Sequence, residues 1–119
     1  LISALGADPV YYPCKVRCCG GMLMMTEEKL ALKLNHNLLL AASENGADMI
    51  ATACPLCQMN LEAYQSRINK LYGQSFSIPI VYFTHLVGAA LGLDEKTLGL
   101  DRLLIPAPRL TKTTEVASV

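Results

Sequence analysis

The sequence predicts an α/β fold, in which a small and mostly parallel sheet is flanked by helices and carries a cysteine site at its strand carboxyl ends. Short apolar or β-branched runs alternate with helical patterns along the chain, as in β-α-β units. The 119 residues are 52% hydrophobic, which is enough for one core without disulfides. Five cysteines gather in two tight groups, and each group follows a predicted strand, where sites of parallel sheets collect.

The chain opens with a helical pattern and a short strand pattern. Residues 1–7 have the composition of the last turns of a helix, with Gly6 as its stop, so we expect an N-terminally truncated domain. Residues 8–12 contain β-branched and aromatic side chains, which favour a strand. Neighbours in a strand face opposite ways, so Tyr11 and Tyr12 should divide between surface and core.

The next two segments are predicted to be a loop and a helix. Residues 13–21 show no sustained period and contain three cysteines and a glycine pair, which predicts a loop that carries the chemistry. Thr26 is a favourable N-cap for the helix that follows, and Gly46 is expected to end it. Its apolar stripe at helical spacing consists of Leu30, Leu34, Leu38 and Ala41 or Ala42.

A buried strand and a second helix surround the second cysteine group. The strand is expected over 47–53, which places Cys54 at its carboxyl end. The helix pattern covers 58–72, begins within or directly after the cysteine pair, and ends at Gly73. The expected buried face of this helix is Leu61, Tyr64, Ile68 and Leu71, and the expected solvent face is Glu62, Arg67 and Lys70.

Residues 78–83 form the clearest strand pattern in the chain. Thr84 should cap a short helix that runs to Gly92, and 94–98 predict one more helical turn. The stretch 103–119 contains two prolines and a Ser/Thr-rich end, which favours an arm or a loose tail.

Composition and charge argue against several classes of function. Ten basic and ten acidic residues balance, so no overall field favours nucleic acid or an anionic membrane surface. Apolar stretches are far shorter than the roughly 20 residues that cross a bilayer. An odd number of clustered cysteines fits a reducing compartment better than a secreted disulfide framework, so we expect a cytoplasmic protein.

The cysteines predict a shared metal or redox site. Cys54 and Cys57 form a Cys-x-x-Cys pair, which suits one metal, and Cys18 and Cys19 can complete the ligands from a second segment. Adjacent cysteines rarely ligate one tetrahedral ion but can bind separate irons, which favours an iron-sulfur cluster over zinc. Ordinary buried thiols, and a thioredoxin-like dithiol that would leave Cys18 and Cys19 unexplained, are the alternatives.

Other polar and apolar residues have weaker candidate roles. His85 could supply a proton to the site, although a histidine bonded to backbone at a helix cap is the more common arrangement. His36 is expected on a solvated helix face. Asn60 could hydrogen bond either to the site or to a helix end. Three methionines could line an apolar pocket but more often fill a core; they are Met22, Met24 and Met25.

Cys18-Cys19-Gly20 followed by Cys54-Pro-Leu-Cys57 resembles the CCG, or cysteine-rich, domain found in the B subunit of heterodisulfide reductase and in its relatives. Residues 54–62 and 78–85 look closer to that protein than to more distant members. The resemblance implies a CCG domain over 1–105 and a C-terminal arm over 106–119. In that family a further cysteine precedes the Cys-Cys pair, and it would lie upstream of this chain.

The resemblance also implies a cofactor, a reaction and partners. The cofactor is a non-cubane 4Fe-4S cluster, at which a small disulfide or thiol substrate reacts in one-electron steps. The implied partners of the protein are other iron-sulfur and flavin subunits of a heterodisulfide reductase-like complex. An isolated fragment is expected to be inactive. The implied cluster ligands and catalytic residues are Cys18, Cys19, Cys54 and Cys57, with Cys14 as a further candidate.

Two other interpretations of the same residues are kept. The iron-sulfur subunit of a lactate, glycolate or succinate oxidising system shares the CCG domain. A non-catalytic zinc-binding interaction module would use the same cysteines for structure alone. Because the upstream cysteine is missing, zinc, a disulfide or an empty site are also expected possibilities for this stretch of chain.

Overall fold

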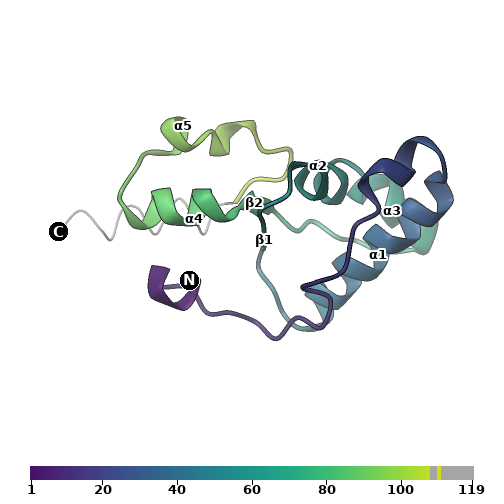
Figure 1. Ribbon diagram of the computed structural model, residues 1–119, viewed down its shortest axis with the longest axis horizontal. Coiled ribbons are helices and arrows are strands. Elements are labelled where there is room, and N and C mark those ends of the chain that lie inside the picture. Colours follow the sequence, from purple (N-terminus) through teal and green to yellow (C-terminus); the bar gives the residue numbers. More distant parts are fainter. Residues whose placement is uncertain (108–109, 111–119) are drawn as a thin grey trace.

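The computed structural model describes residues 1–107 and residue 110, and it shows a small parallel sheet covered mainly by helices (Figure 1). The predicted α/β class is confirmed, with more helix than strand. In chain order the described elements are the 3₁₀ helices η1 (Ser3–Leu5) and η2 (Gly21–Met25), α1 (Glu28–Glu44), β1 (Ile50–Thr52), α2 (Pro55–Ala63), α3 (Gln65–Tyr72), β2 (Ile80–Tyr82), α4 (Phe83–Ala90), α5 (Glu95–Leu98) and η3 (Leu100–Arg102).

The two strands run parallel, with Ile50 opposite Ile80 and Thr52 opposite Tyr82. The crossover between them consists of α2 and α3. Both strands lie inside the predicted stretches 47–53 and 78–83 but are shorter than predicted. A three-residue strand suffices because each strand has one neighbour and the surrounding helices cover the sheet.

The sheet separates two apolar cores. Ile80 belongs to the core under α1, α2 and α3, whereas the next residue, Val81, belongs to the core under α4, and both are fully buried. This alternation follows from the two-residue period of a strand. In Figure 1, α4 and α5 lie on one side of the strands and α1, α2 and α3 on the other. Cysteines of both groups belong to the first core or pack against it.

The prediction of a strand over 8–12 is wrong, because these residues form no strand and the described sheet has only two strands. β-branched residues give a strand only where another edge is available for pairing. The segment is tied down instead by the hydroxyl of Tyr12, which donates to the carbonyl oxygen of Leu38 at 3.1 Å. Tyr11 is exposed and Tyr12 partly buried, so their predicted division is confirmed.

Helix α1 starts later than its sequence pattern indicated, and its buried face matches the predicted stripe at Leu38 and Ala42 but not at Leu30. Its N-cap is Glu27, while Thr26 ends η2, so the predicted cap, Thr26, does not cap this helix. Leu30 is exposed, and the buried residues of the helix are Ala31, Leu32, Asn35, Leu38, Leu39 and Ala42. A purely apolar stripe misses this face because Asn35 lies on it with its amide hydrogen-bonded. Helix α1 ends at Glu44, close to the predicted stop at Gly46.

The helix predicted over 58–72 begins at Pro55 and is two helices, which meet at Tyr64. Gly73 ends the second one in the left-handed conformation, as expected. Leu71 is exposed rather than buried. Glu62 is buried rather than solvated, because its carboxylate accepts hydrogen bonds from the side chain of Gln58 and from the backbone N–H of Ile105.

The remaining helix termini match the predictions only in part. Gly6 stops a short 3₁₀ turn with a φ of 82°. Helix α4 starts at Phe83, so Thr84 lies within its first turn and is not its cap. Asp94 caps α5 by accepting a hydrogen bond from the backbone N–H of Thr97. Most of the predicted tail, 103–119, lies outside the described residues.

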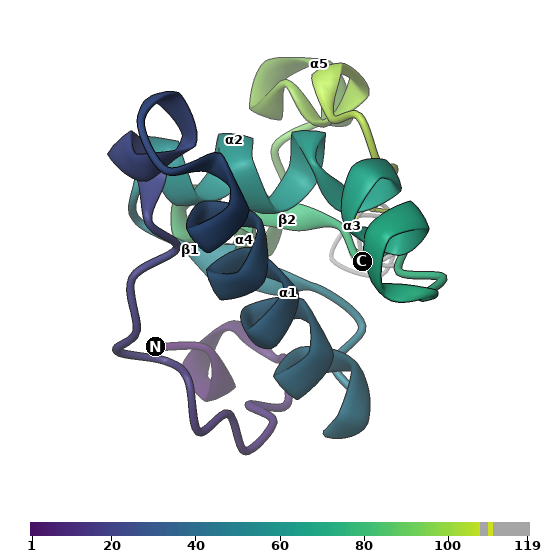
Figure 2. The same cartoon turned by 90° about the vertical axis from the view of Figure 1, so that its right-hand side faces the viewer.

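None of the helices in the described ranges is both long enough and apolar enough to cross a membrane. Figure 2 shows how these elements bring the cysteine segments together: η2, in dark blue, lies beside α2 at the end of α1 where that helix begins.

Candidate functional site

The second cysteine group lies where β1 passes into α2. The backbone N–H of Cys54 donates to the hydroxyl of Thr52 at 3.1 Å, which turns the chain out of the strand. Cys54 is then the N-cap residue of α2, and Pro55 takes the first helical position, where a missing N–H costs nothing. Cys54 therefore lies between the carboxyl end of β1 and the amino end of α2, and both positions were predicted from the sequence.

The first cysteine group reaches the same place through its glycine pair. Gly20 has a φ of 72°, and a Cβ atom there would lie 2.8 Å from the Cδ1 of Leu34 on α1. A Cβ atom on Gly21 would lie 2.9 Å from the Cβ of Leu56 on α2. Both distances are shorter than ordinary contacts, so the absence of side chains lets this loop approach two helices closely.

The four predicted ligands, Cys18, Cys19, Cys54 and Cys57, line one cavity of about 280 Å³. Neighbouring Cys18 and Cys19 differ sharply in burial, since Cys18 is exposed and Cys19 is only 1% exposed. The rest of the lining consists of glycine and apolar side chains: Gly20, Gly21, Met22, Leu23 and Leu56. Sulfur is therefore the only side-chain donor type in this cavity among the described residues.

The sulfur atoms of the second group have contrasting acidities. The backbone N–H of Cys57, its side chain and the backbone N–H of Leu56 lower the pKa of Cys54 by hydrogen bonding to its thiolate. Burial raises the pKa of Cys57 to about 12, with further contributions from Cys19 and Cys54. Cys57 thus interacts with a cysteine on each side and links the two groups.

Two buried amides support the Cys19 segment, and sequence reasoning found only one of them. Asn60 on α2 donates to the carbonyl oxygen of Gly21 at 3.3 Å and lies 4.0 Å from the sulfur of Cys19. Of its two predicted roles, the structure therefore favours the contact with the site. Asn35 on α1 donates to the carbonyl oxygen of Cys19 at 2.9 Å. Its only sequence signal was a polar residue beside an apolar stripe.

Cys14 does not line the cavity and packs against the first core. Cys14 also lies near Tyr12. Burial raises the pKa of Tyr12 to about 12, and Cys14 and Cys57 contribute to this rise. Cys18, in contrast, lines the cavity, and its sulfur accepts a hydrogen bond from the backbone N–H of Gly20 at 3.3 Å.

The two histidines lie away from the cavity lining. His85 accepts a hydrogen bond from the backbone N–H of Tyr82 through Nδ1 at 3.2 Å, which confirms the helix-cap interpretation. His36 is not on a solvated face as predicted: its ring stacks on Tyr72 with centroids 4.1 Å apart and also contacts Phe76. A helical pattern could not show this contact, because both aromatic rings come from a distant segment, the end of α3 and the residues after it.

The two predicted roles of the methionines are each confirmed for one residue, and Met25 fits neither. Met24 packs against the first core, but Met22 and Met25 are 72% and 87% exposed. Met22 also lines the cysteine cavity. A 3₁₀ helix places residues three apart on one side, so Met22 and Met25 project from the same side of η2.

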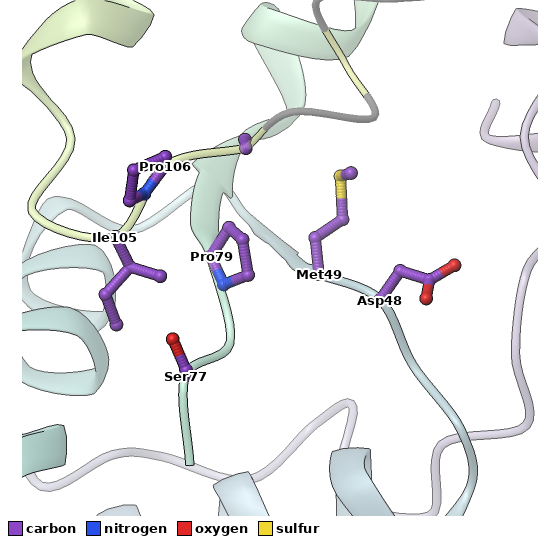
Figure 3. A pocket seen from close by; sticks show the side chains of 7 residues that line it. Asp48, Met49, Ser77, Pro79, Ile105 and Pro106 are labelled. Atoms are coloured by element: carbon purple, nitrogen blue, oxygen red, sulfur yellow. The ribbon is translucent and has the colours of Figure 1, made fainter.

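The residues that the structure describes contain no group of three or more His, Cys, Asp or Glu side chains that could hold a metal ion. The four sulfurs share a cavity but do not form a single-ion site. A second cavity of about 320 Å³ lies at the opposite, amino ends of the strands (Figure 3). Its lining lacks cysteine and histidine: Asp48, Met49, Ser77, Pro79, Ile105, Pro106 and Ala107. We therefore take the cysteine cavity as the candidate site.

A family model described as a cysteine-rich domain, CCG, matches residues 1–62, a range that contains all five cysteines. The chain belongs to the CCG family. Within its CCG match lie both cysteine groups, η2 and the start of α2, so the family match covers the whole lining of the candidate site.

Several curated proteins are similar to this CCG chain over most of its length. It is 34% identical over 110 residues to an 8-methylmenaquinol:fumarate reductase membrane anchor subunit from Wolinella succinogenes, covering 92% of this chain and 39% of the relative. It is 32% identical over 104 residues to the B subunit of a ferredoxin/F(420)H(2)-dependent CoB-CoM heterodisulfide reductase from Methanosarcina acetivorans, covering 86% and 35%.

A third relative, from Archaeoglobus profundus, is named as a protein like the B subunit of heterodisulfide reductase; it is 34% identical over 103 residues, which cover 84% of this chain and 34% of the relative. The predicted resemblance to the heterodisulfide reductase B subunit is confirmed. The chain spans little more than a third of the length of the curated relatives that it matches.

Proposed function

We propose that this chain is the CCG domain of an iron-sulfur redox subunit in a heterodisulfide reductase-like complex. The observation that carries the proposal is the cavity in which two cysteines from the loop before α1 meet two cysteines from the start of α2. The domain is taken as residues 1–105, with 106–119 as a C-terminal arm. The names of the relatives support a role in a multi-subunit oxidoreductase.

The residues present fit an iron-sulfur cluster. Cys18, Cys19, Cys54 and Cys57 would hold it, because thiolates are the usual protein ligands of such clusters. Because Cys18 and Cys19 are adjacent in the chain and both line the cavity, they suit a group with several metal atoms better than one tetrahedral ion. All five thiols are free, as a metal site in a reducing compartment such as the cytoplasm requires.

The protein supplies the setting for that cofactor, which we propose to be a non-cubane 4Fe-4S cluster. When bound, such a cluster provides single electrons for the cleavage or formation of a disulfide in a small thiol substrate. The backbone N–H groups of Leu56 and Cys57 stabilise negative charge on the sulfur of Cys54. Apolar walls from Met22, Leu23 and Leu56 lower the polarity around the sulfurs. Cys14 remains a candidate for a further ligand.

The decisive experiment is metal analysis of the intact protein together with electron paramagnetic resonance of the oxidised protein in the presence of a thiol substrate. We expect about four irons per domain, as a 4Fe-4S cluster requires, and a signal that changes when the thiol is added. Stoichiometric zinc without iron would instead identify a structural zinc module and refute the redox proposal. The expected electron-donating partners are other iron-sulfur and flavin subunits, which should co-purify with the intact protein.

A second candidate function is supported by the relative from Wolinella succinogenes, which is named as a subunit of an 8-methylmenaquinol:fumarate reductase. In this alternative the chain belongs to the iron-sulfur subunit of a succinate- or fumarate-linked system, in line with the lactate, glycolate or succinate class. The two candidates differ in the electron acceptor of the intact complex. Activity with fumarate and a reduced quinol, but not with a disulfide, would favour the second candidate.

A further inference from the structure

Asn60 is a fully buried polar residue that lies three residues after Cys57 and faces the other cysteine group. Its Nδ2 donates to the carbonyl oxygen of Gly21 at 3.3 Å and lies 4.0 Å from the sulfur of Cys19. Its Oδ1 has no hydrogen-bond partner among the described residues. A buried amide oxygen without a partner destabilises a fold, so stability alone does not explain asparagine here.

The contacts define how the Asn60 amide is oriented. Its Nδ2 group lies next to the carbonyl oxygen of Gly21 and the sulfur of Cys19, and both of these atoms are acceptors. The opposite orientation would place the amide oxygen against the carbonyl oxygen of Gly21. The donor side of Asn60 therefore faces the Cys19 segment.

Asn35 provides a natural comparison on the opposite helix. It is also fully buried, and its Oδ1 also has no partner within the described ranges. Its Nδ2 donates to the carbonyl oxygens of Cys19 at 2.9 Å and Ala31 at 2.8 Å. Asn35 thus holds the backbone of Cys19, whereas Asn60 also approaches its sulfur.

We infer that Asn60 is a positioning residue for the Cys19 sulfur, whose amide N–H sets the place and the charge of that atom when it binds the cluster. The inference rests on the proposed function. An N–H group directed at a ligand sulfur stabilises negative charge there, so it favours the reduced state of a bound iron-sulfur cluster and raises its reduction potential. Removal of this donor should shift the potential to a more negative value.

The first test compares Asn60→Ala with Asn35→Ala in the intact, iron-loaded protein. Both variants should lose stability, because each removes buried hydrogen bonds to the same segment. Only Asn60→Ala should shift the midpoint potential of the bound cluster to a more negative value, as measured by redox titration. An unshifted potential in Asn60→Ala, or the same shift in both variants, would overturn the inference.

The second test does not need the cluster or a folded Asn60 variant. In the metal-free intact protein with ¹⁵N-labelled asparagine, Cys19→Ala should move the side-chain amide resonance of Asn60, while Cys18→Ala should leave it in place. An Asn60 resonance that is unaffected by Cys19→Ala would refute the contact. A wild-type protein that binds no iron would refute the proposed function and the effect on potential, and the resonance would still decide the contact.

Discussion

Adjacent residues of this chain can have very different surroundings, and the cysteine pair is the clearest case. Cys18 is exposed and its sulfur accepts a backbone hydrogen bond, while Cys19 is buried between two asparagines. A loop without a regular period gives no sequence signal for such a difference. The surroundings of each single residue therefore decide which thiols can bind one cluster and which only lie near it.

Substitution of the cysteines should separate ligands from neighbours. Cys18→Ser and Cys54→Ser each remove a thiol from the cavity, so both should abolish the iron content of the intact protein. Cys14→Ser is the matched control, because Cys14 lies outside the cavity lining, and it should retain most of the iron. Iron and acid-labile sulfide analysis measures this, and equal loss in Cys14→Ser would show that the ligand assignment is wrong.

Gly21→Ala should destabilise the protein by about 1–3 kcal/mol, because the new Cβ atom would overlap the side chain of Leu56. The combination with Leu56→Ala should recover part of this loss, because it removes the Cδ1 atom of Leu56 at 3.1 Å but keeps its Cβ atom at 2.9 Å. Urea unfolding of the four proteins gives the coupling energy.

Gly46→Ala is a suitable control for that cycle. A Cβ atom there meets nothing within 4 Å, but the φ of Gly46 is +72°, so its cost has a conformational origin. Leu56→Ala should not change the cost of Gly46→Ala. Additive effects of Gly21→Ala and Leu56→Ala would contradict the predicted overlap.

At the scale of elements, most helix starts in the described residues lack a side-chain cap from Ser, Thr, Asp or Asn. Thr26 and Thr84 were expected as caps, but α1 starts after Glu27 and α4 starts after Tyr82. At α4 the backbone N–H of Tyr82 is satisfied by the imidazole of His85. Asp94, which was not predicted as a cap, caps α5 by accepting a hydrogen bond from the backbone N–H of Thr97.

The His85 contact predicts a pH dependence of stability. Burial lowers the pKa of His85 below its usual value of 6.5, so the unfolded chain binds the proton more tightly than the folded one. The contribution to stability is therefore complete above pH 6.5 and decreases as the pH falls from 6.5 through the lower folded pKa. Protonation would also remove the acceptor for the Tyr82 N–H.

His85→Gln should keep an acceptor at this helix position, since glutamine serves in capping boxes, and it should remove this part of the pH dependence. The measurement is the free energy of unfolding of both proteins between about pH 8 and 5, a range that spans the usual histidine titration. The difference between wild type and variant should change with pH only in the acidic part. A constant difference throughout would contradict the role of His85 protonation.

At the scale of the whole molecule, the two-stranded sheet divides the fold into a face that carries the cysteine site and a face that does not. Cys19 belongs to the same core as Ile80, and Leu86 on α4 belongs to the other core. Gln65 ties α3 to the segment before β2, since its amide both donates to and accepts from the backbone of Ile78.

This division predicts different effects for two substitutions of similar size. Ile80→Ala and Leu86→Ala should each cost about 2–5 kcal/mol, because each removes a buried side chain. Iron content at a temperature where both variants remain folded should fall in Ile80→Ala, whose core contains Cys19, and stay near the wild-type value in Leu86→Ala. Equal losses of iron would show that the two faces do not act separately.

Much of the fold could be predicted from local patterns, and the failures have a common cause. Strands at 50–52 and 80–82 and the glycine ends at Gly6 and Gly73 depend on neighbouring residues, so the pattern indicated them. The strand over 8–12 needed a pairing edge from elsewhere and did not form. The buried face of α1 and the break at Tyr64 depend on packing against distant segments.

The sequence by itself determined the residue types of the candidate site and the family: two cysteine groups, each after a predicted strand, and a resemblance that the family match confirmed. Within the described residues, only the second group follows a strand. Only the tertiary structure decided that Cys18 and Cys19 share a cavity with Cys54 and Cys57, and that Asn35 and Asn60 hold the segment between them in place. Residue type and spacing are local properties, whereas a shared cavity requires segments more than thirty residues apart to pack together, and that packing depends on the whole core.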